Sequence, residues 1–331
     1  MSNEERIDED DKDDGERQEP APERPDPEKG EMWQFLVVLR ALLRTVDEPP
    51  RRTRHERLPL DDMLFILITK VFFRFSSADH CLFLELLHPD LQPLGRIPHR
   101  NSIINCMRME RLRPILEALV CTCSRVLILY TGVLFAIDGT PMLTPGYYES
   151  KDKKTGKLYE RRNWIRLHMI CDVLTGVVTA VRADSNKVSE QKYFKVLIDE
   201  TINLGFHVEA VAADKYYCTK DNVRWASEER GIETNITLKK NAVRSKKNSD
   251  PAWDENYDRA KSVDPDVKVK FHQRAIIESV NAFIKGKYGG ELFSKSAAGQ
   301  YNEALCKVIC RNLIVLIRYS RKMGLTPGFE K

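Results

Sequence analysis

The cysteines of this chain lack the spacings that zinc sites use. Eight cysteines occur in 331 residues, yet no two of them form a C-x-x-C pair. The closest neighbours are Cys121 and Cys123, and then Cys306 and Cys310, which lie one helical turn apart. The common zinc-binding modules are therefore excluded. The pattern favours buried apolar thiols in a reducing compartment.

Residues 1–31 have almost no apolar side chains. Ile7 is the one aliphatic residue larger than Ala, and the segment carries 14 acidic and 5 basic residues. Such a segment cannot bury enough apolar surface to offset the entropy of ordering it. We predict a disordered acidic tail over 1–31, which either keeps the protein in solution or screens a basic body as a weak mimic of DNA.

Long apolar runs and a targeting signal are also missing. A secretory signal begins with basic residues followed by an apolar stretch, whereas this terminus is acidic. Apolar runs such as VLILYTGVLFAI, residues 126–137, are too short to cross a bilayer. We therefore expect an intracellular, cytoplasmic protein that makes no use of a membrane.

Positive charge is abundant outside the tail. Residues 32–331 hold 48 basic and 35 acidic side chains, which gives a net charge of +13. A body this basic favours a polyanionic partner, and nucleic acid is the first candidate. A soluble basic protein with no such partner has the same composition.

Residues 32–130 have the pattern of an all-helical region. Apolar residues recur at helical spacing, and Pro49 and Pro50 end the first helix. A helical pair is followed by a short segment with five arginines, as a helix-turn-helix requires for reaching the major groove. Ordinary helical regions share these features, so a DNA-binding region over 32–130 is a hypothesis. The arginines are Arg96, Arg100, Arg108, Arg111 and Arg113.

Residues 131–325 have the pattern of an α/β domain. Three β segments come first, and the second and third form a hairpin that turns at Thr175 and Gly176. A helix, a strand, a helix and a strand follow, then a loop of about thirty residues and two helices. The first three strands can pair as an antiparallel meander, while the last two need crossover helices and add in parallel. We predict an RNase-H-like mixed sheet flanked by helices.

Two aspartates lie on predicted strands at positions where an α/β sheet commonly forms its active-site crevice. Asp138 interrupts an apolar strand, and Asp214 ends the run VEAVAAD. Either one alone is more often structural, but the first and fourth strands of the predicted sheet are neighbours. Glu278, from a later helix, can then approach the same point. Three converging carboxylates in a basic protein predict a site for two divalent cations that act on a phosphodiester.

The helix predicted for residues 271–290 carries charges along one stripe. Arg274 and Glu278 are four residues apart, and Lys285 follows two turns later. Glu278 could then bind a metal ion, while Arg274 and Lys285 on either side of it bind phosphate groups. Without the two aspartates, an ordinary surface ion pair followed by an unrelated Lys would be the better interpretation.

Two of the three acidic residues lie in blocks that resemble those of the DDE transposases of insertion sequences. The first block of that family is an Asp within a strand, followed by a small residue and Thr, and AIDGT matches it with Asp138 and Thr140. The second block, Asp-Lys-Gly-Tyr, is similar to the segment that begins at Asp214. Tyr216 replaces its Gly, which we expect to alter the turn.

The third block of that family is Tyr-x2-Arg-x3-Glu-x6-Lys. Phe271, Arg274, Glu278 and Lys285 occur at these spacings, with Phe in place of Tyr. The aromatic face that could stack on a base is kept, although the hydroxyl is lost. The resemblance covers residues 130–325 and is looser over 32–130.

The resemblance implies a DNA transposase. Such an enzyme would bind the terminal repeats of its element, hydrolyse phosphodiester bonds at the ends and join the 3′-OH ends to target DNA. The implied cofactor is Mg²⁺, with Mn²⁺ as a substitute, and the implied partners are double-stranded DNA and a second copy of the chain. The implied metal ligands are Asp138, Asp214 and Glu278, and the implied DNA-binding residues are Phe271, Arg274 and Lys285.

Two other functions fit the same residues. One is an RNase-H-like nuclease that cuts without joining, and the other is a domesticated or inactive copy that only binds DNA. Two basic segments, KDKKTGKLYERR at 151–162 and LKKNAVRSKKN at 238–248, flank the predicted site. We expect both to be loops that line a DNA channel, although most such runs are only solvated.

Overall fold

The computed structural model describes most of the chain, but little of the predicted tail. The described residues are 30–47, 58–87, 97–151, 155–246, 249–324 and 327–329. The prediction of a disordered tail therefore falls almost entirely outside them. Its last residue, Glu31, opens the first helix, and its carboxylate accepts from Lys287 Nζ at 2.9 Å and Arg318 Nε at 3.2 Å. The helical region thus begins one residue earlier than predicted.

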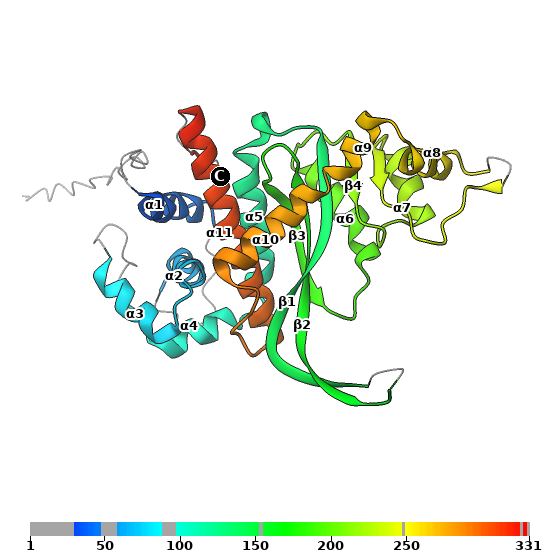
Figure 1. The fold of residues 1–331 in the computed structure, drawn as a ribbon. Helices are drawn as coiled ribbons and strands as arrows, with labels where there is room; N and C mark the ends of the chain where they lie inside the picture. Colours follow the sequence, from blue (N-terminus) through cyan, green and yellow to red (C-terminus); the bar gives the residue numbers. More distant parts are fainter. Residues whose placement is uncertain are drawn as a thin grey trace, which may run out of the picture.

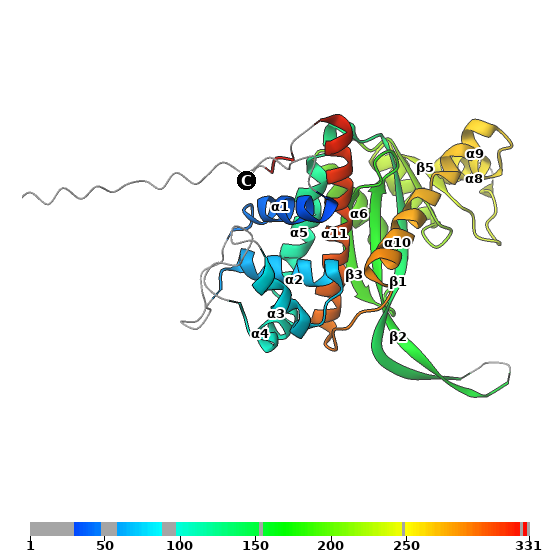
Figure 2. The same cartoon turned by 60° about the vertical axis from the view of Figure 1, so that its left-hand side comes forward.

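Five helices lie in the described part of the N-terminal region, as the apolar periodicity predicts. Figures 1 and 2 show α5 lying with the C-terminal helix between the other four and the sheet. The connection between the third and fourth helices, 87–99, is longer than the turn of a helix-turn-helix. Its residues 88–96 lie outside the described part, so DNA reading by this region stays a prediction. The helices are α1 (Glu31–Leu43), α2 (Leu60–Phe73), α3 (Ser77–Leu86), α4 (Arg100–Met107) and α5 (Leu112–Arg125).

A mixed five-stranded sheet confirms the predicted RNase-H-like fold. Its strands lie in the order β3-β2-β1-β4-β5, so the first and fourth strands are neighbours. β1 pairs with β2, and β2 with β3, in antiparallel fashion, whereas β4 and β5 add in parallel. The predicted hairpin turn is present, with Gly176 at φ +69°. The strands are β1 (Leu134–Lys151), β2 (Leu158–Asp172), β3 (Val178–Ser185), β4 (Ala210–Ala213) and β5 (Glu233–Ile236).

The first basic segment is not wholly the loop that its composition suggests. β1 reaches Lys151 at its start and β2 begins at Leu158 within it, and the two strands project from the sheet as a two-stranded arm (Figure 1). A shift in register between Leu143 and Tyr147 marks the point where the arm leaves the sheet. The polar composition of the segment predicts a loop, but β1 and β2 remain paired beyond the edge of the sheet as far as Lys151 and Leu158. Residues 152–154 at its tip lie outside the described residues.

The prediction of a thirty-residue loop before the last two helices is also wrong. It contains two helices, and each begins with an Asp N-cap followed by Pro at its first position. Asp250 accepts from the amide of Trp253 at 3.3 Å, and Asp264 accepts from the amide of Asp266 at 2.9 Å. The helices around the sheet are α6 (Tyr193–Asn203), α7 (Lys220–Arg224), the π-helical turn η4 (Trp225–Glu229), α8 (Pro251–Lys261), α9 (Pro265–His272), α10 (Ala275–Tyr288) and α11 (Ala297–Met323).

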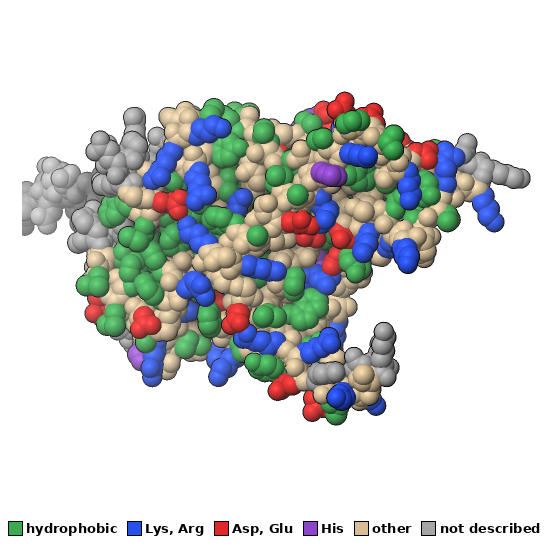
Figure 3. All heavy atoms as spheres, in the orientation of Figure 1, with side chains coloured by type: hydrophobic (Ala, Val, Ile, Leu, Met, Phe, Trp, Pro, Cys, Tyr) green, Lys and Arg blue, Asp and Glu red, His purple; other side chains and the backbone are tan. Residues whose placement is uncertain are grey.

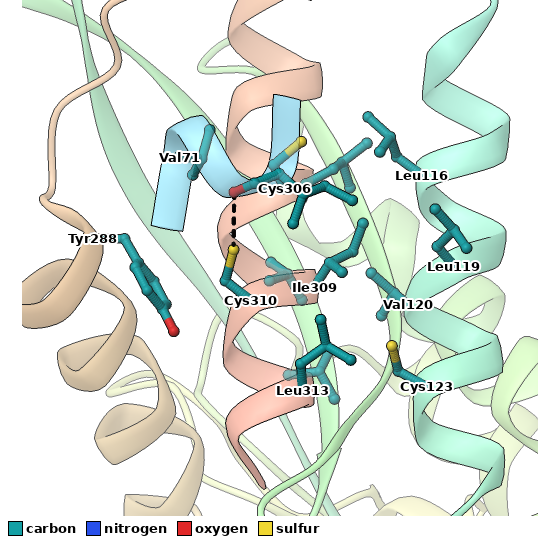
Figure 4. Close-up of a cluster of buried hydrophobic side chains, with 14 of the residues drawn as sticks. Val71, Leu116, Leu119, Val120, Cys123, Tyr288, Cys306, Ile309, Cys310 and Leu313 are labelled. Atoms are coloured by element: carbon teal, nitrogen blue, oxygen red, sulfur yellow. Dashed lines mark hydrogen bonds between the residues drawn. The ribbon is translucent and has the colours of Figure 1, made fainter. Parts of the chain in front are cut away.

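The helical region and the sheet share one hydrophobic core. A single cluster of buried residues extends from Phe35 in α1 to Ile317 in α11 and covers one face of the sheet. Figure 4 shows its centre, where α5 and α11 pack together and Cys310 Sγ donates to the carbonyl of Ile68 in α2 at 3.6 Å. A second cluster beneath α6 and α7 covers the other face. The division predicted at residue 130 therefore runs through a continuous core.

The thiols agree with the prediction of buried cysteines. All eight cysteines are free, and all except half-buried Cys81 are buried. Of the helices in the described part of the chain, none is both long and apolar enough to cross a bilayer.

Candidate functional site

Asp138 and Asp214 lie on adjacent strands, as predicted: Asp138 lies within β1, and Asp214 directly follows β4. β1 and β4 run parallel, with Ile137 opposite Ala213, so each Asp is the next residue along its strand. The two carboxylates are close enough that the charge of Asp214 raises the pKa of Asp138. A β-turn follows β4, in which the Asp214 carboxylate accepts from the amide of Tyr216 at 2.5 Å. Tyr216 keeps an ordinary φ, so the turn does not need the Gly of the family pattern.

Asp138 is held in an environment that disfavours its charge. Burial raises its pKa to about 6, while the charge of Arg274 acts in the opposite direction. Asn281 Nδ2 donates to its Oδ2 at 3.0 Å, and the Oδ1 of this Asn is buried without a hydrogen-bond partner. A half-buried carboxylate that meets another acid and one neutral amide is well placed to receive a cation.

Of the three charged residues predicted to share one helix, Glu278 and Lys285 lie in α10, and Arg274 directly precedes it. Residues 271–290 form two helices, and Arg274 is the N-cap of the second, α10. The Arg274 guanidinium bonds the Glu278 carboxylate at 2.6 Å, and that carboxylate is about half exposed. This is the surface pair of the simpler interpretation, but its Arg also acts on Asp138. Arg274 therefore lies within electrostatic reach of both acids.

The two remaining predicted residues also face the region. Lys285, two turns after Glu278, is half-buried; burial lowers its pKa and the charge of Asp138 raises it. Phe271, at the end of α9, lines a cavity of about 550 Å³ with Arg274 and Lys268. An aromatic ring beside two cations suits a ligand that has an aromatic face and negative charge.

Asn281 is the residue that the sequence prediction missed. It lies three residues after Glu278 and four before Lys285, so it completes their stripe on α10. Its spacing from Glu278 and Lys285 was visible in the sequence. Amides on helices are common, however, and only the structure shows that this one reaches Asp138.

A second missed group lies behind the strand that carries Asp138. The ion pair of Arg166 and Glu190 packs on Gly139, where an added methyl would lie 3.1 Å from Arg166 Cδ and 3.4 Å from Glu190 Cδ. This crowding explains the small residue after Asp138 in the first block. The Tyr217 hydroxyl is fully buried without a partner, and Glu190 and Asp138 add to the effect of burial in raising its pKa. No sequence signal marks Glu190.

The residues fit divalent cations in chemistry, and two of the three predicted acids, Asp138 and Asp214, lie on neighbouring strands. Within the described ranges, no group of three or more His, Cys, Asp or Glu side chains is arranged to hold a metal ion. Asp138 and Asp214 nevertheless supply oxygen donors on neighbouring strands. Burial chiefly raises the pKa of Asp138 and the charge of Asp214 adds to the effect, and a bound cation would favour the ionised form. The convergence of Glu278 with these two stays a prediction.

Given the metal-binding role predicted for Asp138, replacing Asn281 with Ala is expected to slow the predicted DNA cleavage by about 10- to 100-fold, the usual effect of losing a partner of a metal ligand. Loss of the amide donor raises the pKa of Asp138 further, so the acidic limb of the pH–rate profile should move upward. Cleavage rates between pH 5 and 9 measure both effects. Ser279→Ala, an exposed change on the same helix, is the control. A slower rate with an unmoved profile would show that Asn281 does not act through Asp138.

Comparisons of the sequence and the structure with known proteins identify the family of the chain. The chain is similar to a solved structure described as a piggyBac transposase synaptic complex with hairpin DNA, with a TM-score of 0.46 and 11% identity, over 89% of this chain and 74% of that one. No curated protein matches the chain. The family model described as "Transposase DDE domain" matches residues 130–313, more than half of the sequence, and so the chain belongs to the transposase DDE family.

Proposed function

We propose that this protein is a DNA transposase that binds the terminal repeats of an insertion sequence. It hydrolyses phosphodiester bonds at the element ends and joins the freed 3′-OH ends to target DNA. The observation that carries the proposal is the pair Asp138, within β1, and Asp214, directly after the neighbouring β4, beside the helix that bears Glu278. The work on DNA would take place in the cytoplasm, at the nucleoid, with two copies of the chain in the active complex.

The proposed site residues divide into two groups. Asp138, Asp214 and Glu278 would hold two Mg²⁺ ions, or Mn²⁺ in their place. The bound cations would polarise the scissile phosphodiester and lower the pKa of the attacking water or hydroxyl. Arg274 and Lys285, on either side along α10, would bind the flanking phosphates. Phe271 would stack on a base in the cavity at the junction of α9 and α10.

The shape of this face supports a DNA channel. Figure 3 shows a hollow between the β1–β2 arm and the block formed by α8 and α9, with Lys and Arg side chains on both sides and acidic side chains near α10. A cationic rim around an acidic centre suits a polyanion that must bring one phosphate to the acids. Metal-dependent cleavage of DNA carrying the element ends tests the proposal, and inverted repeats that bracket the gene would identify those ends.

Salt dependence of DNA binding tests the second basic segment. Changing Lys239, Lys240, Lys246 and Lys247 together to Gln should flatten the dependence of log affinity on log salt, by about 0.9 for each phosphate that is no longer neutralised. Of the four, Lys247 lies outside the described residues. Preference for the terminal repeat over random DNA should survive, because phosphate contacts carry little sequence information.

Fluorescence anisotropy titrations between 50 and about 300 mM salt measure this slope. A control with Arg125 and Lys322 changed to Gln removes two exposed cations elsewhere on the chain. An unchanged slope in the quadruple variant would place the DNA channel away from this segment.

A further inference from the structure

A cationic cavity lies outside the proposed catalytic site. It has a volume of about 570 Å³, within the range of small-ligand pockets, and lies between α2, α4 and the segment after α10. Four cationic side chains line it, and no carboxylate does so among the described residues. Its wall also has an apolar part that includes Phe75, Met107 and Phe293. The cations are Lys70, Arg74, Arg108 and Lys295.

Of the four cations, Arg74 is close enough to Glu291 for its charge to help Arg162 lower the pKa of that carboxylate. None of them forms an ion pair with a carboxylate of the described residues, although most arginines of the sheet and of α8 do. Arg74 also adopts a left-handed conformation at the end of α2, with φ +59°, which is uncommon for a residue with a side chain. That conformation places its guanidinium against Gly289, at the end of α10. Unpaired cations around one hollow favour an anionic ligand.

The aromatic side of the cavity is exposed but firmly held. Phe293 is 62% exposed, and its backbone amide donates to the Glu303 carboxylate at 3.0 Å. The amide of Ser294 donates to the same carboxylate at 2.9 Å, and Lys307 Nζ donates to the carbonyls of Gly289 and Glu291. An exposed aromatic ring on a fixed backbone, next to cations without ion pairs, is the combination that proteins use to bind and stack single-stranded nucleic acid.

We infer that this cavity binds an unpaired nucleotide of DNA, with its base on Phe293 and its phosphates on the four cations. The inference rests on the proposed function, since it names a second DNA subsite of the same enzyme. Glu278 and Gly289 are eleven residues apart along α10 and its end, about 16 Å at the rise of an α-helix. That distance is about five nucleotides of a B-form strand, so one strand could contact both sites.

The test compares two DNA probes with the full-length protein. One is a blunt duplex, and the other is the same duplex with a five-nucleotide 3′ single strand that carries 2-aminopurine. Phe293→Ala should weaken binding of the single-stranded probe about tenfold and leave the blunt duplex within about twofold. It should also remove the change in 2-aminopurine fluorescence on binding. Arg108→Ala with Lys295→Ala should lower the salt slope for the single-stranded probe by about 1.4.

Leu129→Ala is the matched control, because Leu129 is 88% exposed and does not line the cavity. Phe293, Arg108 and Lys295 are all exposed, so thermal unfolding of these variants should match wild type. Equal losses for both probes, or no loss for either, would overturn the inference and leave cleavage at Glu278 untouched. If the wild-type protein binds neither probe, the proposed function fails and the inference fails with it.

Discussion

Replacing Glu278 with Gln is expected to abolish DNA cleavage and to leave binding of the element ends largely intact. The amide nearly keeps the shape of the side chain but loses the charge needed to hold a divalent cation. We expect cleavage to fall by at least about 10³-fold, since charge stabilisation by a metal ion is worth several kcal/mol. The folded state should change little, because the Arg274–Glu278 pair is half exposed and such pairs contribute about 0–1 kcal/mol.

A matched control for this variant exists on α8. Glu255 and Arg259 are also four residues apart on a helix, with a 3.9 Å contact, and Glu255 is exposed. Glu255→Gln should cleave at the wild-type rate, and both variants should bind DNA as wild type does. If Glu278→Gln cleaves normally in Mg²⁺, Glu278 is not a ligand and the exposed ion pair is merely a surface feature.

Asp138→Asn is expected to abolish cleavage and to stabilise the metal-free protein at neutral pH. Burial raises the pKa of Asp138 from 3.8 to about 6, so the folded state holds the proton more tightly than the unfolded chain does. The stability that this group contributes is complete below pH 4 and is lost as pH rises through about 6. At pH 7 the ionised carboxylate therefore costs about 3 kcal/mol, which the neutral amide avoids.

Chemical unfolding in EDTA at several values between pH 4 and 8 measures this effect. The variant should match wild type near pH 4 and exceed it increasingly up to pH 7. Asp258→Asn, at an exposed carboxylate on α8, should show no such difference. Mg²⁺ should stabilise wild type more than Asp138→Asn, since only wild type keeps the full set of ligands. Parallel pH profiles for the two proteins would show that Asp138 is not strained by burial.

The strand order was predictable because each step follows from local patterns. Three β segments without room for crossovers must pair as a meander, and two strands with helices before them must add in parallel. The arm of β1 and β2 could not be predicted in the same way. Lys151 and Arg161 are exposed on it, so the alternation of buried and exposed residues that marks a strand is absent. The two Asp-Pro helix starts at Asp250 and Asp264 were visible in the sequence, and they outweigh the polar composition around them.

The site was predictable to the extent that the order of the strands determines it. Asp138 and Asp214 follow from the topology, whereas the orientation of Glu278 depends on charges that only the fold assembles. Its carboxylate pairs with Arg274, and Asn281 instead reaches Asp138. Glu190 lies near Asp138 through packing on Gly139, a contact across elements that sequence spacing cannot show.

The most direct test of the proposed function is a strand-transfer assay with a labelled 3′ end. Duplexes that end in the terminal repeat are incubated with the protein, plasmid DNA and Mg²⁺, and the label is followed into the plasmid. A transposase joins the label to the plasmid in wild type, and the product disappears with Glu278→Gln or EDTA. Cleaved ends that never join would instead identify a nuclease, and intact DNA that is bound but not cut would identify an inactive DNA-binding copy.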